Sequence, residues 1–169
     1  MSPGRRLRPP APASVLETDV SQAVQRGLAL IARRPRTAAD LRDRLGDRFE
    51  AASADAALAR LAELGYVDDA AWAAAYVART RSTERSARML RAELLQHGVD
   101  AETAEHALFA HDDDEAAMAA ARRLARGGRG RAPDAQARRM QGALARRGFS
   151  FDVIGRALSR VAEERATAA

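Results

Sequence analysis

The amino-acid sequence predicts an all-α protein built from three tandem three-helix repeats that resemble helix-turn-helix units. Alanine makes up about a quarter of the chain and aromatic residues only 4%, a composition that favours helices over strands. Apolar residues recur every three or four positions, which is the spacing of one helix face. Leu45, Leu94 and Leu144 lie 49 and 50 residues apart, and this interval indicates a repeat.

A tail and three repeats make up the predicted domain organisation. Residues 1–18 are rich in proline and arginine and lack periodicity, so we expect them to form a disordered basic tail. The three repeats are expected over residues 19–67, 68–111 and 112–165.

The first repeat shows how each helix is predicted. An apolar stripe runs from Val20 to Ile31, and this helix must end before Pro35 because proline cannot continue it. Thr37 is expected to cap a second helix, and a third helix is expected over residues 53–64.

Glycines near three helix ends predict sharp turns. Gly98 and Gly148 occupy matching places in the second and third repeats, and Gly65 ends the first repeat. A glycine just beyond a helix can adopt the left-handed conformation, and an apolar residue after it then packs against the last turn. The residues expected to cap the next helices are Asp68, Asp100 and Ser150. The first repeat has no glycine at the matching place in its GDRFEAAS stretch, so the sequence leaves that turn type open.

Three of the seven aromatic residues lie close together in the sequence. Tyr66 closes the first repeat and Trp72 and Tyr76 begin the second, and their spacing predicts that they are interior residues at the joint between the two repeats. The alternative is a platform on which the bases of a single strand stack, because arginines follow these aromatics.

Composition argues against several classes of function. All 28 basic residues are arginine, so there is no lysine-containing phosphate loop, and there is no cysteine for a thiolate or a cysteine-based zinc site. No apolar run reaches the roughly 20 residues of a membrane span, and the start lacks the apolar core of a signal peptide. We therefore expect a cytoplasmic protein with no enzymatic activity, no cofactor and no metal.

Two polar stretches allow both a functional and a structural interpretation. The HDDDE stretch, residues 111–115, could hold a metal ion, but acidic residues at a helix start are also favoured by the helix dipole. The RGGRGRAP stretch, residues 126–133, is expected to be a hinge between two helices and could also touch phosphates.

Charge is unevenly distributed along the chain. Residues 122–147 hold nine arginines and one acid, whereas residues 93–115 hold eight acids and no arginine. This segregation predicts separate fields on the folded surface, with the basic field suited to a polyanion. The alternatives are a solvated helix face and an arginine content set by genome base composition.

The arginines are the candidate contact residues for a partner protein or DNA. No helix combines Asn, Gln and Arg in a way that predicts base reading, so we expect contact with phosphates or with an acidic protein. The candidates are Arg79, Arg81, Arg85, Arg88, Arg91, Arg122, Arg123, Arg126, Arg139 and Arg146.

Three stretches resemble the RecX family of recombinase regulators. The first is a leucine-glycine-aromatic turn with paired aspartates, an aromatic and an arginine: Leu64, Gly65, Tyr66, Asp68, Asp69, Trp72 and Arg81. The second, RAELLQHGVD, contains Arg91, Glu93, Leu94, Gly98 and Val99, and the third, ARRGFSFDVIGRAL, contains Gly148 and Phe149. The chain departs from the family pattern at Trp72, where phenylalanine is common, at His97, where lysine is common, and at Ser82 and Thr83, near an expected glycine.

The resemblance implies a crescent-shaped array of repeats that lies in the groove of the RecA filament on DNA and bridges neighbouring protomers. Members of the family restrain RecA by lowering its DNA-dependent ATPase, strand-exchange and co-protease activities. This implies a monomeric regulator in DNA repair, homologous recombination and the SOS response, with DNA contacted directly or through the filament. Two alternatives are a free-standing helix-turn-helix protein that binds DNA and a helical adaptor for some other protein.

Overall fold

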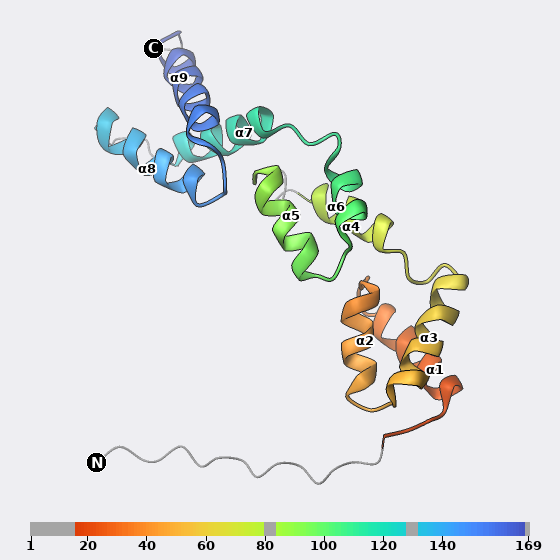
Figure 1. Cartoon of the computed structure of the whole chain (residues 1–169). Helices are drawn as coiled ribbons and strands as arrows, with labels where there is room; N and C mark the ends of the chain where they lie inside the picture. The colour runs from red at the N-terminus through yellow and green to blue at the C-terminus, as the bar shows by residue number, and fades with distance from the viewer. Residues whose placement is uncertain (1–15, 80–83, 128–131, 168–169) are drawn as a thin grey trace, which may run out of the picture. The chain divides into compact units, whose positions relative to one another are not determined.

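The computed structural model describes residues 16–79, 84–127 and 132–167. Within these ranges the chain forms nine α-helices, which Figure 1 shows as successive groups of three. The helices are α1 (Val20–Ile31), α2 (Ala38–Gly46), α3 (Ala51–Glu63), α4 (Asp69–Val77), α5 (Ala87–Gln96), α6 (Ala101–Leu108), α7 (Asp113–Arg126), α8 (Pro133–Ala145) and α9 (Phe151–Thr167). The prediction of an all-α fold of tandem three-helix repeats is confirmed.

Helices α1–α3 enclose a core of their own. Leu41, Leu45 and Leu61 are fully buried in it. Helix α1 approaches α3 closely at Gly27, where a Cβ atom would lie 2.5 Å from the Cδ1 atom of Leu61. The predicted cap of α2 is confirmed, because the hydroxyl of Thr37 accepts a hydrogen bond of 3.1 Å from a backbone N–H in the first turn.

The turn between α2 and α3 is closed by the segment that precedes α1. The side chain of Phe49 is only 2% exposed, and its N–H donates to the carbonyl of Leu45 at 2.8 Å. Glu17 pairs with this turn: its N–H donates to the carbonyl of Arg48, and its carbonyl accepts from the N–H of Glu50, both at 2.9 Å. The prediction of a disordered tail up to residue 18 is therefore wrong at its end, whereas residues 1–15 lie outside the described residues.

The three glycine turns are confirmed. Gly65, Gly98 and Gly148 have φ values of 73°, 78° and 89°, and they are the positive-φ residues in the described part of the chain. At the second turn, the N–H of Val99 donates to the carbonyl of Leu94 at 3.1 Å, as this helix ending requires. The carboxylates of the predicted caps Asp68 and Asp100 each accept a backbone N–H in the next helix.

The aromatic residues near the first glycine turn divide between interior and surface. Trp72 and Tyr76 are half-buried against the core of α4–α6, and their rings stack with centroids 5.1 Å apart. Tyr66 was predicted to be interior, but its side chain is 53% exposed. The backbone between Gly65 and Asp69 is not helical, so helical spacing does not apply to Tyr66, and its neighbour Val67 is the residue that packs into the core of α1–α3.

The chain divides into two compact units, Met1–Val67 and Asp68–Ala169. The second unit contains two cores: one between α4, α5 and α6, and one between α7, α8 and α9. Among the helices that the structure describes, none has the length and apolar content needed to cross a membrane.

Candidate anion-binding site

A close joint holds the second and third repeats together within the second unit. The N–H of Ser86, just before α5, donates to the carbonyl of Arg147 at 3.0 Å. The N–H of Ala87 donates to the carboxylate of Asp113, at the start of α7, at 2.7 Å. A Cβ atom on Gly148 would overlap the hydroxyl of Ser86, so glycine is required for this approach as well as for the positive φ.

Arginines from three helices or their ends converge beside this joint. They line a hollow of about 330 Å³, which we call the joint hollow, and its lining residues are Glu84, Arg85, Met89, Arg123, Arg146 and Arg147. Three of the candidate arginines are therefore brought together from distant parts of the sequence. Sequence reasoning missed Arg147, although its place between Arg146 and Gly148 in the glycine turn was a usable signal.

Two of the four arginines in the joint hollow have a carboxylate partner. Arg85 forms an ion pair with Glu93, which also accepts a hydrogen bond of 2.8 Å from the Tyr76 hydroxyl. Arg123 forms an ion pair with Glu84, whose side chain is only 12% exposed. Burial and the nearby carboxylate of Glu93 raise the pKa of Tyr76, so its hydroxyl stays protonated and donates.

The other two arginines of the joint hollow have no carboxylate partner among the described residues. The guanidinium of Arg147 donates to the carbonyl of Ala143 at 3.0 Å, and that of Arg146 lies beside Gly142. In the described part of the chain, no ion pair involves Arg146 or Arg147. Burial lowers the pKa of Arg147, and the positive charge of the neighbouring Arg123 lowers it further. The joint hollow therefore carries positive charge that the described residues do not neutralise.

Two further candidate arginines are neutralised by carboxylates from other helices. Arg91 on α5 forms an ion pair with Glu105 on α6. Arg122 on α7 donates to Glu164 on α9, with the Nε atom 3.1 Å from the carboxylate. Both pairs join neighbouring helices, and both are exposed to solvent, which weakens their effect on stability.

Two other candidates contact neutral groups. The guanidinium of Arg79 lies over the ring of Tyr76, 5.5 Å from its centroid. Arg88 reaches across the joint and donates to the carbonyl of Gly148 at 3.4 Å. Each keeps its positive charge at the surface while covering part of the fold.

The remaining candidates are exposed or fall outside the described residues. Arg126 and Arg139 are exposed at the end of α7 and on α8, and no ion pair is recorded for either within the described ranges. Arg81 lies outside the described residues.

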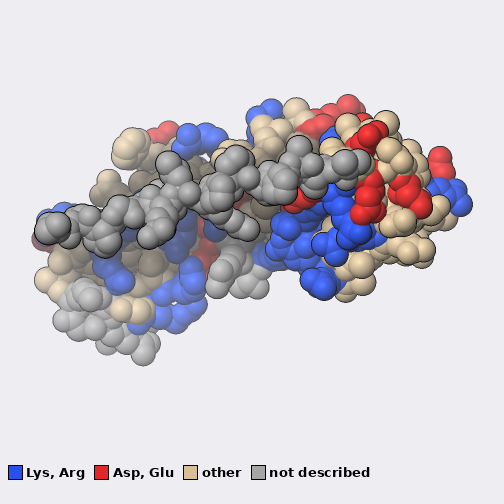
Figure 2. Space-filling view, turned by 90° about the horizontal axis from the view of Figure 1, so that it is seen from below, with Lys and Arg blue, Asp and Glu red and all other residues tan. Residues whose placement is uncertain are grey.

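The predicted segregation of charge is only partly retained after folding. The basic segment, residues 122–147, is not separate from acidic groups in the fold, because Arg122 and Arg123 pair with acids from other parts of the chain. In the acidic segment, Glu93, Glu105 and Asp114 likewise pair with arginines. On the face drawn in Figure 2, blue arginine atoms gather in groups, and red acidic atoms lie next to several of them. The prediction of separate acidic and basic fields is wrong for these pairs.

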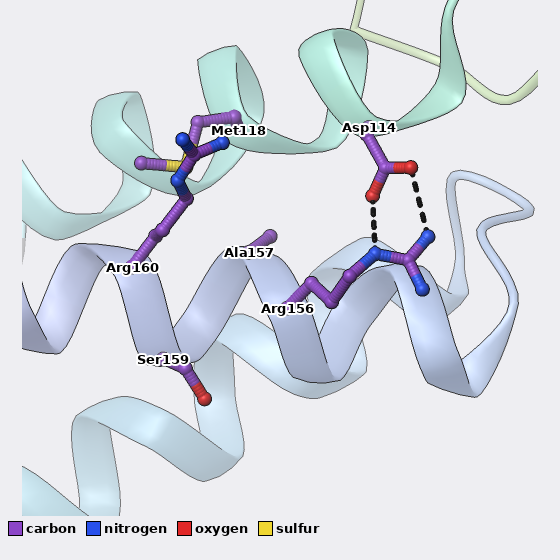
Figure 3. A pocket seen from close by; sticks show the side chains of 6 residues that line it. All are labelled: Asp114, Met118, Arg156, Ala157, Ser159 and Arg160. Atoms are coloured by element: carbon purple, nitrogen blue, oxygen red, sulfur yellow. Dashed lines mark hydrogen bonds and ion pairs between the residues drawn. The ribbon is translucent and has the colours of Figure 1, made fainter.

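The HDDDE stretch begins α7 and connects it to its neighbours. Asp112 caps the helix by accepting from the N–H groups of Asp114 and Glu115 at 2.7 and 3.2 Å. Figure 3 shows Asp114 in a two-point contact with Arg156 on α9, with both N–O distances 2.8 Å. The described ranges hold no group of three or more His, Asp or Glu side chains suited to a metal ion.

A second hollow, of about 590 Å³, lies between α7 and α9 (Figure 3). Its polar side chains include the paired Asp114 and Arg156, and Arg160 extends toward the side chain of Met118. Acidic and basic groups are mixed here, so this hollow offers an anion less attraction than the joint hollow does.

In a comparison with known proteins, models of one family match the three repeats in the order in which they occur along the chain. Three family models match: RecX, first three-helix domain, over residues 23–61; RecX, second three-helix domain, over residues 68–108; and RecX, third three-helix domain, over residues 112–158.

Relatives named "Regulatory protein RecX" match as well. The protein from Thermobifida fusca (strain YX) is 38% identical over 148 residues, which cover 84% of this chain and 80% of the relative. A protein from Thermus thermophilus is 46% identical over 88 residues, or 52% of this chain, and that match spans only 61% of the relative's length.

Two solved structures share the fold. The crystal structure of RecX from Lactobacillus salivarius matches with a TM-score of 0.70 and 21% identity, covering 83% of this chain and 95% of that one. A second crystal structure, of a regulatory protein RecX, matches with a TM-score of 0.64 and 25% identity, covering 79% of this chain and 68% of that one.

Proposed function

The chain belongs to the RecX family, and from this premise we propose that it is a regulatory protein that binds the RecA filament on DNA. It bridges neighbouring protomers in the filament groove and inhibits the ATPase, strand-exchange and co-protease activities of the filament. The observation that carries the proposal is the presence of all three RecX three-helix domains, in order, between residues 23 and 158.

The arrangement of the helices supports binding to a partner that repeats along a lattice. Each three-helix repeat has a core of its own, so each can present side chains to a different protomer. Weak contacts made by several linked repeats add up to strong binding through their high effective concentration. The proposal assigns regulation to this chain, and no reaction of its own.

The exposed arginines of the third repeat are the side chains that we assign to the filament. Arg139 and Arg146 lie on α8 and at its end, both exposed, and no described carboxylate pairs with either. An arginine fork without an internal partner is free to pair with a carboxylate or phosphate of the filament.

The test is DNA-stimulated ATP hydrolysis by the cognate recombinase, with and without this protein. We expect the wild-type chain to reduce hydrolysis, and the double variant Arg139→Glu with Arg146→Glu to require at least about tenfold more protein for the same reduction, since reversing two charges replaces attraction with repulsion. A variant of the same net charge, Arg26→Glu with Arg33→Glu, changes exposed arginines of the first repeat and serves as the control.

Two results would count against the proposal. Hydrolysis that is unaffected by saturating, correctly folded wild-type protein would refute the inhibition. Equal inhibition by the α8 variant and the control, with helicity intact in both, would show that this flank of the third repeat is not the contact.

A free-standing DNA-binding protein is the second candidate function, and the unneutralised charge of the joint hollow favours it. This function predicts binding to duplex DNA in the absence of recombinase, with affinity that falls steeply as salt is raised. Absence of duplex binding at low salt, measured by fluorescence anisotropy, would eliminate it.

A further inference from the structure

We propose that the joint hollow is a phosphate-binding site that takes one phosphate group of a nucleic-acid backbone. Arg146 and Arg147 form the site, and Arg85 and Arg123 line the rest of the hollow. The phosphate site rests on the proposed function, because a filament on DNA is what brings nucleic acid to this chain. Its test requires no recombinase.

Charge balance is the first argument. Four arginines line the joint hollow, and two of them have acidic partners: Glu84 pairs with Arg123, and Glu93 pairs with Arg85. The charges of Arg146 and Arg147 are left over. Like charges held close together repel one another, and an anion seated among them removes that repulsion.

Placement of the arginines is the second argument. Arg146 and Arg147 lie at the C-terminal end of α8, where the helix dipole alone would favour a positive charge. The dipole does not account for Arg85 and Arg123, which reach the same hollow from the start of α5 and from α7. Convergence from separate elements is typical of a binding site rather than of a capped helix end.

Preorganisation of the donors is the third argument. Each guanidinium has five N–H donors in a rigid fork. Arg147 uses one of them on the carbonyl of Ala143, and this contact holds the side chain in place. Glu84 holds Arg123 in the same way. Side chains already held in position lose less conformational entropy when an anion binds.

The directions from which the arginines reach the hollow are the fourth argument, and they favour phosphate over carboxylate. The volume of the joint hollow, 330 Å³, is near the lower end of the range of ligand pockets, about 300–1,000 Å³. A small charged group fits such a space. Donors approach from three elements, and the tetrahedral oxygens of a phosphate can accept from several directions, whereas a planar carboxylate accepts mainly in one plane.

The experiment measures binding of a fluorescein-labelled oligothymidylate to the full chain, by anisotropy, over a series of salt concentrations. The test variant is Arg146→Gln with Arg147→Gln, which leaves the ion pair between Arg123 and Glu84 and the backbone bonds of the joint in place. The matched control, Arg138→Gln with Arg160→Gln, removes the same charge from exposed arginines that do not line the joint hollow.

We expect the test variant to bind at least about tenfold more weakly than the control, since a charged hydrogen bond contributes about a factor of ten or more. The slope of log affinity against log salt should also fall by about 0.7 for one lost phosphate contact with a single strand. If Arg147→Gln unfolds the joint, as judged by thermal melting, Arg146→Gln alone carries the test, because its side chain is exposed.

A second arm identifies the anion. Inorganic phosphate should shift the arginine Nε–H signals of the wild-type chain in NMR spectra and should leave those of the test variant unchanged. Equal affinity and equal salt slope for the test variant and the control would overturn the proposal. Response to an oligoglutamate peptide without any response to phosphate or oligothymidylate would also overturn it, because the site would then recognise carboxylates.

The phosphate site and the regulatory function can fail separately. Loss of oligothymidylate binding together with full inhibition of the recombinase would support the phosphate site while assigning filament binding to other residues. Inhibition by a chain that binds no nucleic acid at all would refute the phosphate site and leave the regulatory proposal standing.

Discussion

Single residues at the joint decide how closely the second and third repeats approach. Gly148 combines a φ of 89° with a position where a Cβ atom would overlap the hydroxyl of Ser86 and lie 3.1 Å from the Cβ of Met89. The hydroxyl of Ser86 is itself needed, because it accepts the N–H of Met89 and caps α5 at 3.2 Å. The joint therefore cannot relax around a larger residue without breaking a helix cap.

Replacement of Gly148 by alanine is expected to destabilise the second unit. The left-handed conformation alone costs a residue with a Cβ about 1–2 kcal/mol, and the overlap with Ser86 adds to this. Urea denaturation followed by circular dichroism measures the change. The control is Gly155→Ala in α9, where the new methyl group would meet no atom within 4 Å beyond its chain neighbours and the backbone of its own helix, and where alanine should stabilise the helix by about 0.5–1 kcal/mol. Equal stability of the wild type and Gly148→Ala would contradict the role assigned to the joint.

Pairs of helices are held together by regularly spaced contacts, most clearly between α7 and α9. Asp114 forms an ion pair with Arg156. Two turns further along both helices, Arg122 forms an ion pair with Glu164. Between them the same spacing brings Met118 next to Arg160. The first and third helices of the repeat therefore run side by side in the same direction, and the ion pairs keep them in register above the apolar core.

Acid is expected to weaken the contact between α7 and α9. The hydrogen bond from Arg156 holds the pKa of Asp114 below its usual value, and the hydrogen bond from Arg122 does the same for Glu164. A carboxyl group with a lowered pKa contributes stability above its ordinary pKa and loses it as the pH falls through the lowered value. The stabilisation by these pairs should therefore be present at neutral pH, begin to fall near about pH 4, where free carboxyl groups take up protons, and disappear as the pH falls through the lowered pKa values.

Thermal melting of the double variant Asp114→Asn with Glu164→Gln measures this effect. We expect a lower melting temperature than for the wild type at pH 7 and a gap that closes as the pH falls. Glu163→Gln, which changes an exposed acid with no ion pair among the described residues, should show no such gap at any pH. A gap of constant size across the pH range would mean that the variant acts through packing and not through charge.

At the scale of the whole molecule, the chain consists of two units that hold different numbers of repeats. The first unit contains α1–α3, and the second contains α4–α9. The second and third repeats have separate cores but share the hydrogen bonds of the joint. Elements joined by such bonds are expected to unfold together.

The fragment from Asp68 to Ala169 is therefore expected to fold by itself and to melt in a single cooperative transition. Far-ultraviolet circular dichroism and calorimetry of this fragment measure both properties. Introducing Gly148→Ala into the fragment should broaden or divide the transition, because the two cores would then lose their connection. A fragment without helical structure, or one with two separate transitions before any substitution, would contradict this prediction.

The helices and their ends could be predicted from the sequence because they depend on residues close to one another in the chain. The apolar stripe of α1, the cap at Thr37 and the glycine turns at Gly65, Gly98 and Gly148 all involve contacts within a few residues. The repeat spacing then indicated how many such groups the chain contains. The placement of Tyr66 outside and Val67 inside, in the non-helical backbone after Gly65, could not be read from helical spacing.

By itself, then, the sequence determined the all-α class, the three repeats, the glycine turns and the family. Only the tertiary structure decided which arginines are neutralised and which remain charged, because Arg123 meets Glu84 and Arg122 meets Glu164 across long stretches of chain. The same is true of the joint hollow, where Arg147 joins Arg85. Local conformation follows from neighbours in the sequence, whereas the electrostatic field at a site follows from distances in space, and those distances are established only when the repeats pack together.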